Sequence, residues 1–126
     1  MVIADTSIWI EFFRGNEPYF AKVSDLLDKN EILALSPIFG ELLQGAKNNK
    51  ERSTILEFWN NLPQISEHEL LIRAGMESGR NKWIEKGVGL IDSMLIVAAR
   101  ETISFIWSLD NKLLRLLNHE EMYLVK

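Results

Sequence analysis

Four acidic residues are the side chains best suited to chemistry in this chain of 126 residues: Asp5, Glu41, Asp92 and Asp110. Carboxylates gathered in one place repel one another, and a divalent cation relieves that repulsion. Oxygen ligands without a nearby His or Cys suit the hard ions Mg²⁺ and Mn²⁺. One or two such ions can activate a water molecule, so this set of residues predicts hydrolysis of a phosphodiester bond.

Short apolar segments predict the strands that would position these acids. The segment VIA directly precedes Asp5, and FIWSL directly precedes Asp110. The segments ILAL (32–35) and MYLV (122–125) are two further strand candidates. Helical segments lie between the strands, so the pattern predicts an α/β fold whose parallel sheet is covered on both faces. Ligands bind such sheets beyond the carboxyl ends of the strands, and Asp5 and Asp110 would lie side by side there if their two strands are neighbours.

Apolar residues at helical spacing predict the helices between the strands. In the first half of the chain the predicted helices are one opened by Pro18 and ending near Lys29-Asn30, one capped by Ser36-Pro37 and carrying Glu41, and one that contains Ile55, Leu56 and Trp59 and ends at Leu62-Pro63.

Three further helices are predicted in the second half of the chain. Ser66 and Glu69 have capping-box spacing at the head of the first one. Two glycines of the GVG segment then predict a loop before LIDSMLIVAAR, so that Asp92 lies near the start of the second helix. A short helix over 113–117 precedes the last strand.

Each acid also has a simpler structural interpretation. Asp5 is suited to cap the turn that follows it. Asp92 would be a favourable charge near a helix N-terminus, and Glu41 an exposed helix residue. Asp110, in SLDNK, is a turn former. All four together, in this order along alternating strands and helices, are harder to explain in these terms.

Composition limits the class of protein. Apolar residues make up 47% of the chain and charged residues 25%, which is the balance of a soluble globular domain. The formal net charge of −4 argues against a broad basic surface, although it does not exclude a nucleic-acid substrate. There is no cysteine for a disulfide or a thiolate zinc site, no apolar stretch long enough for a bilayer and no pattern of a secretory signal. We therefore expect a cytoplasmic protein without a membrane partner.

The quoted motifs resemble those of a known family. VIADTSIW, SPIFGELLQGA, GVGLIDSMLIVAAR and FIWSLDNKLL are similar, in order and spacing, to the four signature regions of the PIN-domain family, in particular its small VapC-type toxins. The resemblance implies a single PIN-like nuclease domain over 1–126, with α/β/α layers around a central parallel sheet of about five strands. It also implies an endoribonuclease toxin that depends on Mg²⁺ or Mn²⁺, a cognate antitoxin that blocks it, and a homodimer.

The same resemblance assigns roles to individual residues. It makes the four acids, Asp5, Glu41, Asp92 and Asp110, the catalytic and metal-binding residues. Ser7 matches a polar position two residues beyond the first acid, where it would hold that acid or touch a metal-bound water. Ser108 stands where the family often has Thr and keeps the hydroxyl. Leu113 replaces a frequent Phe, a change that affects packing more than chemistry.

Two other functions are consistent with parts of the sequence. The acidity and the many aromatic residues would also suit a PIN-like binding module that acts through protein contacts without significant catalysis. A phosphatase with a nucleophilic aspartate is disfavoured, because its common motif needs a second Asp where this chain has Ser7.

Basic and aromatic residues outside the acid set also have two interpretations. Trp83, among Arg80, Lys82 and Lys86, would either stack on RNA or lie buried beneath a solvated face. The aromatic residues that follow the first motif, Trp9, Phe12 and Phe13, would either be covered by a partner or pack within the monomer.

Overall fold

Two parallel strands form the centre of the fold. They are β1 (Val2–Ala4) and β2 (Phe105–Trp107), and they pair with Ile3 opposite Ile106. This computed structural model describes residues 1–125. Because the two strands are parallel neighbours, their carboxyl ends point to the same edge of the sheet. The predicted α/β class is therefore confirmed, and the segments that lead into Asp5 and Asp110 lie side by side.

Helices make up most of the remaining chain. In order they are α1 (Thr6–Phe13), α2 (Tyr19–Asp28), α3 (Ser36–Gln44), α4 (Asn49–Asn61), α5 (Leu70–Asn81), the 3-10 helix η1 (Ile84–Lys86), α6 (Leu90–Thr102), α7 (Asn111–Leu114) and the 3-10 helix η2 (His119–Glu121). For the first of them, α1, the sequence predicts no bounds, although Trp9, Phe12 and Phe13 follow the first motif at helical spacing. None of the helices formed by residues 1–125 has the length and apolar character that a membrane crossing requires.

The expected sheet of about five strands is not confirmed. The predicted strands ILAL and MYLV form only isolated parallel bridges, between Ile32 and Val2, between Ala34 and Gln64, and between Met122 and Ile106. The ILAL segment has no room to extend its pairing because α3 begins at Ser36. The strand predicted over FIWSL is also shorter and ends at Trp107. Within residues 1–125, two single bridges therefore join the paired strands to Ile32 and Met122, and a third joins Ala34 to Gln64.

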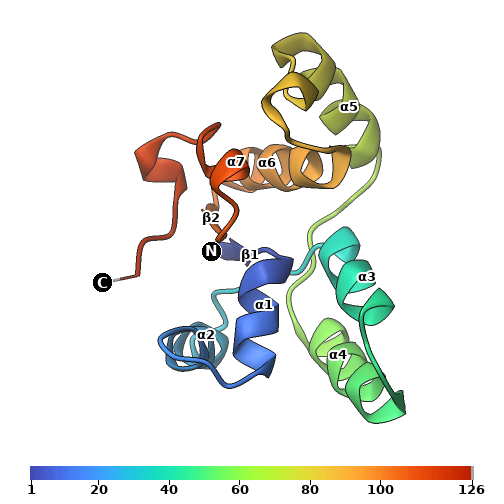
Figure 1. The fold of residues 1–126 in the computed structure, drawn as a ribbon, viewed down its shortest axis with the longest axis vertical. Coiled ribbons are helices and arrows are strands. Elements are labelled where there is room, and N and C mark those ends of the chain that lie inside the picture. The colour runs from blue at the N-terminus through green and yellow to red at the C-terminus, as the bar shows by residue number, and fades with distance from the viewer. Residues whose placement is uncertain (126) are drawn as a thin grey trace.

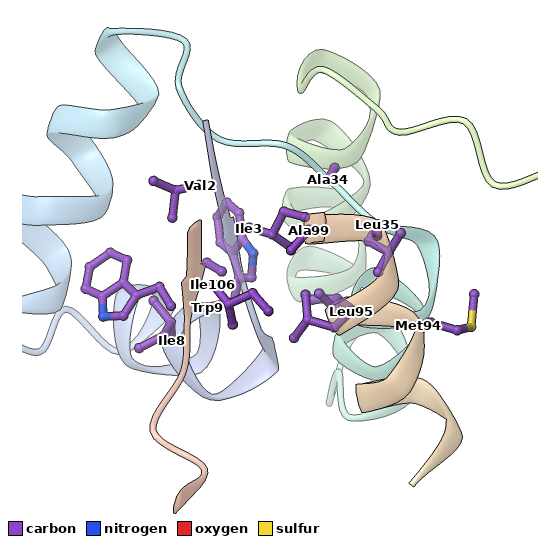
Figure 2. Packing of buried hydrophobic residues seen from close by; sticks show 14 of the residues in the cluster. Val2, Ile3, Ile8, Trp9, Ala34, Leu35, Met94, Leu95, Ala99 and Ile106 are labelled. Carbon is purple, nitrogen blue, oxygen red and sulfur yellow. The ribbon is translucent and has the colours of Figure 1, made fainter. Parts of the chain in front are cut away.

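Helices cover the small sheet on opposite sides. Figure 1 shows β1 and β2 near the middle of the molecule, with α6 and α5 on one side and α1 and α2 on the other. In Figure 2, Ile3 points from β1 toward Leu95 and Ala99 of α6, whereas Val2 points to the opposite side. Alternate strand residues point to opposite faces, so both faces are packed. Ile3 and Leu95 are almost completely buried.

An aromatic cluster joins α1 to the neighbouring helices. Trp9 makes an edge contact with Phe39 of α3, with ring centroids 5.3 Å apart, and lies 5.8 Å from Phe58 of α4. Trp9 and Phe12 are buried, whereas Phe13 is 36% exposed. The monomer itself therefore covers Trp9 and Phe12. This packing holds α1, whose N-terminus carries Asp5, against α3, which carries Glu41.

The structure corrects two predicted helix starts. We expected Ser36 to cap α3, but Ser36 is the first helical residue, and its backbone N–H donates to the Glu67 carboxylate at 2.9 Å. We also expected a capping box between Ser66 and Glu69, which is wrong. Glu69 has a left-handed backbone (φ 56°) and makes no capping hydrogen bond before α5. Glu67, 31 residues from Ser36, is the acid that caps a helix here.

Candidate active site

Asp5 lies at the point where β1 passes into α1. Its extended backbone and side chain make it the N-cap of α1, and its Oδ1 atom accepts a hydrogen bond from the Ile8 N–H at 3.3 Å. Its own N–H donates to the Trp107 carbonyl at 3.0 Å, which ties it to the end of β2. Asp5 is 8% exposed. The interpretation of Asp5 as a helix cap is therefore correct, and its carboxylate is buried.

Two serine hydroxyls hold the Asp5 carboxylate. Ser7 donates to Oδ1 and Ser108 donates to Oδ2. The Ser7 hydroxyl accepts the Leu109 N–H at 3.2 Å, and the Ser108 hydroxyl accepts the Asp110 N–H at 2.9 Å. Burial raises the pKa of Asp5, and the hydrogen bonds from Ser108 and Ser7 oppose that rise. Both serines thus connect Asp5 to the loop after β2.

Asp110 begins α7 at the same edge of the sheet. Its Oδ1 atom accepts hydrogen bonds from the Lys112 N–H at 2.9 Å and the Leu113 N–H at 3.4 Å, so it is the N-cap of α7. The turn interpretation of SLDNK is correct, since the chain leaves β2 and enters α7 within a few residues. The carboxylate remains exposed.

Glu41 reaches this region from α3. Its side chain is exposed, and its Oε1 atom accepts a hydrogen bond of 2.8 Å from the Thr6 hydroxyl at the start of α1. Sequence reasoning assigned no role to Thr6. Its position beside Asp5 was the only available signal, because the partners are 35 residues apart in the chain.

Asp92 lies in the first turn of α6 and is partly buried. Its pKa is raised from 3.8 to about 6, first by burial and then by the negative charges of Asp110, Asp5 and Glu41. Hydrogen bonds do not contribute to the shift. Asp92 is therefore the acid on which the charges of the other three converge, although the four come from different elements.

The four acids are not arranged as a ready-made metal cluster. In the part of the chain that the structure describes, no group of three or more His, Asp or Glu side chains has that geometry. Asp5, Glu41 and Asp110 each accept hydrogen bonds from the protein. The donor chemistry nevertheless fits a hard divalent cation, because all four groups are carboxylates and, after burial, the charges of the other three raise the pKa of Asp92.

Trp83 is not available to stack on a base. It is 4% exposed, and the Arg100 guanidinium lies over its ring at 5.9 Å from the centroid. Arg80 pairs with Glu77 at 3.0 Å on the solvated side of α5. The buried-aromatic interpretation of this segment is the correct one.

Comparison with known proteins identifies the family. The model of the PIN domain matches residues 2–117. The chain belongs to the PIN-domain family. It is also 30% identical over 98 residues to a protein named Ribonuclease VapC32 from Mycobacterium tuberculosis, in strains CDC 1551 and H37Rv, covering 76% of this chain and 73% of that protein. The resemblance to VapC-type PIN proteins is therefore confirmed.

The matched part of the PIN domain contains every residue of the candidate site. Residues 2–117 include the four acids, the two serines and Thr6. The family match therefore covers the whole candidate site, whose acids follow β1 and β2 or lie on α3 and α6.

Proposed function

We propose that this PIN domain is an endoribonuclease that depends on Mg²⁺ or Mn²⁺ and hydrolyses RNA phosphodiester bonds as the toxin of a type II toxin–antitoxin pair. The observation that carries the proposal is the placement of Asp92 near Asp110, Asp5 and Glu41, where burial first and then the negative charges of these three acids raise its pKa. Four carboxylates in one electrostatic neighbourhood favour binding of a divalent cation. The name of the mycobacterial relative, a ribonuclease, supports RNA as the substrate.

Asp5, Glu41, Asp92 and Asp110 would hold the cation. When bound, a divalent ion offsets the charge that develops on the phosphoryl group and lowers the pKa of an attacking water. Among the chain's own residues, Ser7 and Ser108 fix the orientation of the Asp5 carboxylate, and Thr6 fixes that of Glu41.

One of the four carboxylates would also accept the proton of the attacking water. Without a bound cation, burial and the neighbouring negative charges raise the pKa of Asp92 to about 6, so its carboxylate is ionised at neutral pH. In the proposed reaction a water oxygen bonds to phosphorus and its proton passes to a carboxylate. The bond from phosphorus to the 3′ oxygen breaks, and the departing 3′ oxygen takes up a proton from solvent. The products, as the family resemblance implies, carry a 5′-phosphate and a 3′-hydroxyl.

A cleavage assay tests this proposal. Purified wild-type protein should cut structured RNAs with Mg²⁺ or Mn²⁺ and lose that activity with a chelator. Asp5→Asn should abolish cutting, whereas Asp28→Asn, an exposed acid at the end of α2, should cut like the wild type. Equal cutting by the Asp5→Asn variant, or cutting that the chelator leaves unchanged, would show that the activity belongs to another site or to a contaminant.

The biological setting is part of the same proposal. We place this single domain in the cytoplasm as a homodimer with a cognate antitoxin as partner. Exposed apolar side chains on α5, including Ile72 and Met76, support an interface with another chain. Light scattering of the purified protein checks the dimer, and co-expression with the neighbouring reading frame checks the antitoxin. A protein that stays monomeric at all concentrations would contradict the dimer, and failure to form a complex on co-expression would contradict the antitoxin partner.

A further inference from the structure

A cavity of about 480 Å³ lies between α1, α3 and α4, and the candidate catalytic residue Glu41 is in its wall. A chain that binds across the four acids can therefore continue directly into this space. Its volume is in the range of cavities that hold one small ligand or one segment of a larger one.

The lining of the cavity combines apolar and cationic residues. Ile10 and Phe13 of α1 face Leu42 of α3 and Ile55 of α4. Phe13 is 36% exposed although it packs on the aromatic cluster, so part of its ring is free to contact a ligand. An exposed aromatic surface of this kind stacks on nucleobases with little sequence preference.

Three cations lie around this apolar lining: Arg14, Lys47 and Lys50. Arg14 is only loosely paired, at 3.9 Å from Glu11, and its side chain is 67% exposed. Within residues 1–125, Lys47 and Lys50 form no salt bridge with a carboxylate. These cations therefore remain available to an anionic ligand.

The two acids in the cavity wall are already engaged. Glu51 accepts the Lys47 backbone N–H at 2.7 Å, and Glu41 accepts the Thr6 hydroxyl at 2.8 Å. Three cations against two acids make the lining net positive by one charge, whereas the whole chain carries −4. A local excess of positive charge on an acidic protein favours an anionic ligand at this place.

We propose that this cavity binds a nucleotide of single-stranded RNA that flanks the scissile phosphate. Its base stacks on Phe13 and Ile10, and neighbouring phosphates contact Arg14, Lys47 and Lys50. The inference rests on the proposed function, since the strand is aligned by its scissile phosphate at the acids. Continuity with Glu41 favours RNA over an acidic peptide, because a polynucleotide supplies regularly spaced anions together with flat bases.

A matched pair of variants on α4 tests the cationic part. Lys50 lines the cavity, and Arg52 lies two residues away on the same helix, exposed and outside the lining. Each residue is changed to Gln in the Asp92→Asn background, so that cleavage does not consume the probe. Fluorescence anisotropy of a fluorescein-labelled single-stranded RNA, measured over a salt series, gives the dissociation constant.

Lys50→Gln should weaken binding about 3- to 10-fold and reduce the slope of log K against log salt by about 0.7, the value for one lost phosphate contact on a single strand. Arg52→Gln should change the dissociation constant by less than about 2-fold. Equal effects of the two substitutions would overturn the inference.

A second pair tests the cavity itself. Gly45 directly follows α3 and lines the cavity, and a Cβ atom there would meet only carbonyl oxygens of α3, at 3.7 and 3.8 Å. A leucine at this position should therefore be tolerated and reduce the free volume. Gly40, within α3, has no atom within 4 Å of such a Cβ and lies outside the lining. Gly45→Leu should weaken RNA binding at least about 10-fold, and Gly40→Leu should not. Thermal melts of both variants confirm that they fold.

The outcomes separate this inference from the proposed function. If the wild type cuts RNA while Lys50→Gln and Gly45→Leu bind like their controls, the cavity is not a nucleotide site and the nuclease proposal stands. If the variants lose RNA binding but the wild type never cuts with either metal, the cavity stands and the nuclease proposal fails. If Gly45→Leu prevents binding of a co-expressed antitoxin but leaves RNA binding intact, the cavity binds a protein and the inference is overturned.

Discussion

The Thr6 hydroxyl donates a hydrogen bond of 2.8 Å to the Oε1 atom of Glu41. It joins the start of α1 to α3 directly beside Asp5, so one residue links two of the four acids. The aromatic contact between Trp9 and Phe39 holds the same pair of helices together from within the core. Glu41 therefore owes its orientation to α1 as well as to its own helix.

Replacement of Thr6 by valine should reduce RNA cleavage about 5-fold. The variant loses the hydrogen bond that stabilises the orientation of Glu41 by about 1 kcal/mol. Thr6→Ser keeps the hydroxyl and should restore most of the rate. The measurement is the initial rate of cleavage with saturating Mg²⁺. A serine variant as slow as the valine variant would show that the hydrogen bond is not what matters.

Ser108→Ala should destabilise the protein by about 1.5 to 3 kcal/mol, because the buried Asp5 carboxylate loses a hydrogen-bond donor. The same change should raise the pKa of Asp5 further, since hydrogen bonding from Ser108 opposes the effect of burial. Urea denaturation at pH 7 measures the loss, with Ser108→Thr as the control that retains a hydroxyl. A stability of Ser108→Ala equal to that of the wild type would contradict the role of this bond.

Asp92→Asn should stabilise the metal-free protein at pH 7. The folded-state pKa of about 6 is above the ordinary 3.8, so the protonated carboxyl is favoured by folding. The stability that the protonated Asp92 carboxyl contributes to the folded protein is fully present below about pH 4 and is lost as the pH rises through about 6. Because Asp92 is partly exposed, we expect a gain of about 1 to 2 kcal/mol in the variant rather than the full value of the shift.

Denaturation in the presence of a chelator, at pH 4 and at pH 7, measures the difference in stability between Asp92→Asn and the wild type. This difference should vanish at pH 4. Added Mg²⁺ or Mn²⁺ should raise the melting temperature of the wild type more than that of the variant, because the cation relieves the repulsion that asparagine removes. A variant less stable than the wild type at pH 7 without metal would contradict the raised pKa.

Gly87→Ala should cost about 1 to 2 kcal/mol, because Gly87 has a φ of +83° that L side chains rarely adopt. The new Cβ would also lie 2.8 Å from Cδ of Lys112. Lys112→Ala should remove only the second part of the cost, which a double-mutant cycle separates. Gly75→Ala, on α5 with nothing within 4 Å, should instead stabilise the protein by about 0.5 to 1 kcal/mol. A Gly87→Ala variant as stable as the wild type would show that neither the backbone conformation nor the contact with Lys112 restricts this position.

Local sequence was enough to predict several elements of the site. Apolar runs that stop at a carboxylate predicted that Asp5 and Asp110 follow strands. The structure then showed that these two strands, β1 and β2, are parallel neighbours. The GVG segment before a long apolar helix placed Asp92 in the first turn of α6. Such signals lie within a few residues of the acid that they position, so they can be read from the chain.

Predictions failed where a distant partner decided the structure. Glu67 caps α3 in place of the expected Ser36, and the capping box of Ser66 with Glu69 does not form. The segments ILAL and MYLV have the composition of strands, yet neighbouring helices and turns limit them to single bridges. Strand pairing and capping by a remote side chain depend on contacts that no local pattern encodes.

The sequence by itself determined which acids this protein has, their order, and the type of element on which each is carried. Tertiary structure alone decided that Ser7 and Ser108 hold Asp5, that Thr6 holds Glu41, and that the pKa of Asp92 is about 6. The physical reason is that burial, hydrogen bonding and charge repulsion depend on distances between groups far apart in the chain. Those distances exist only once the helices have packed around β1 and β2.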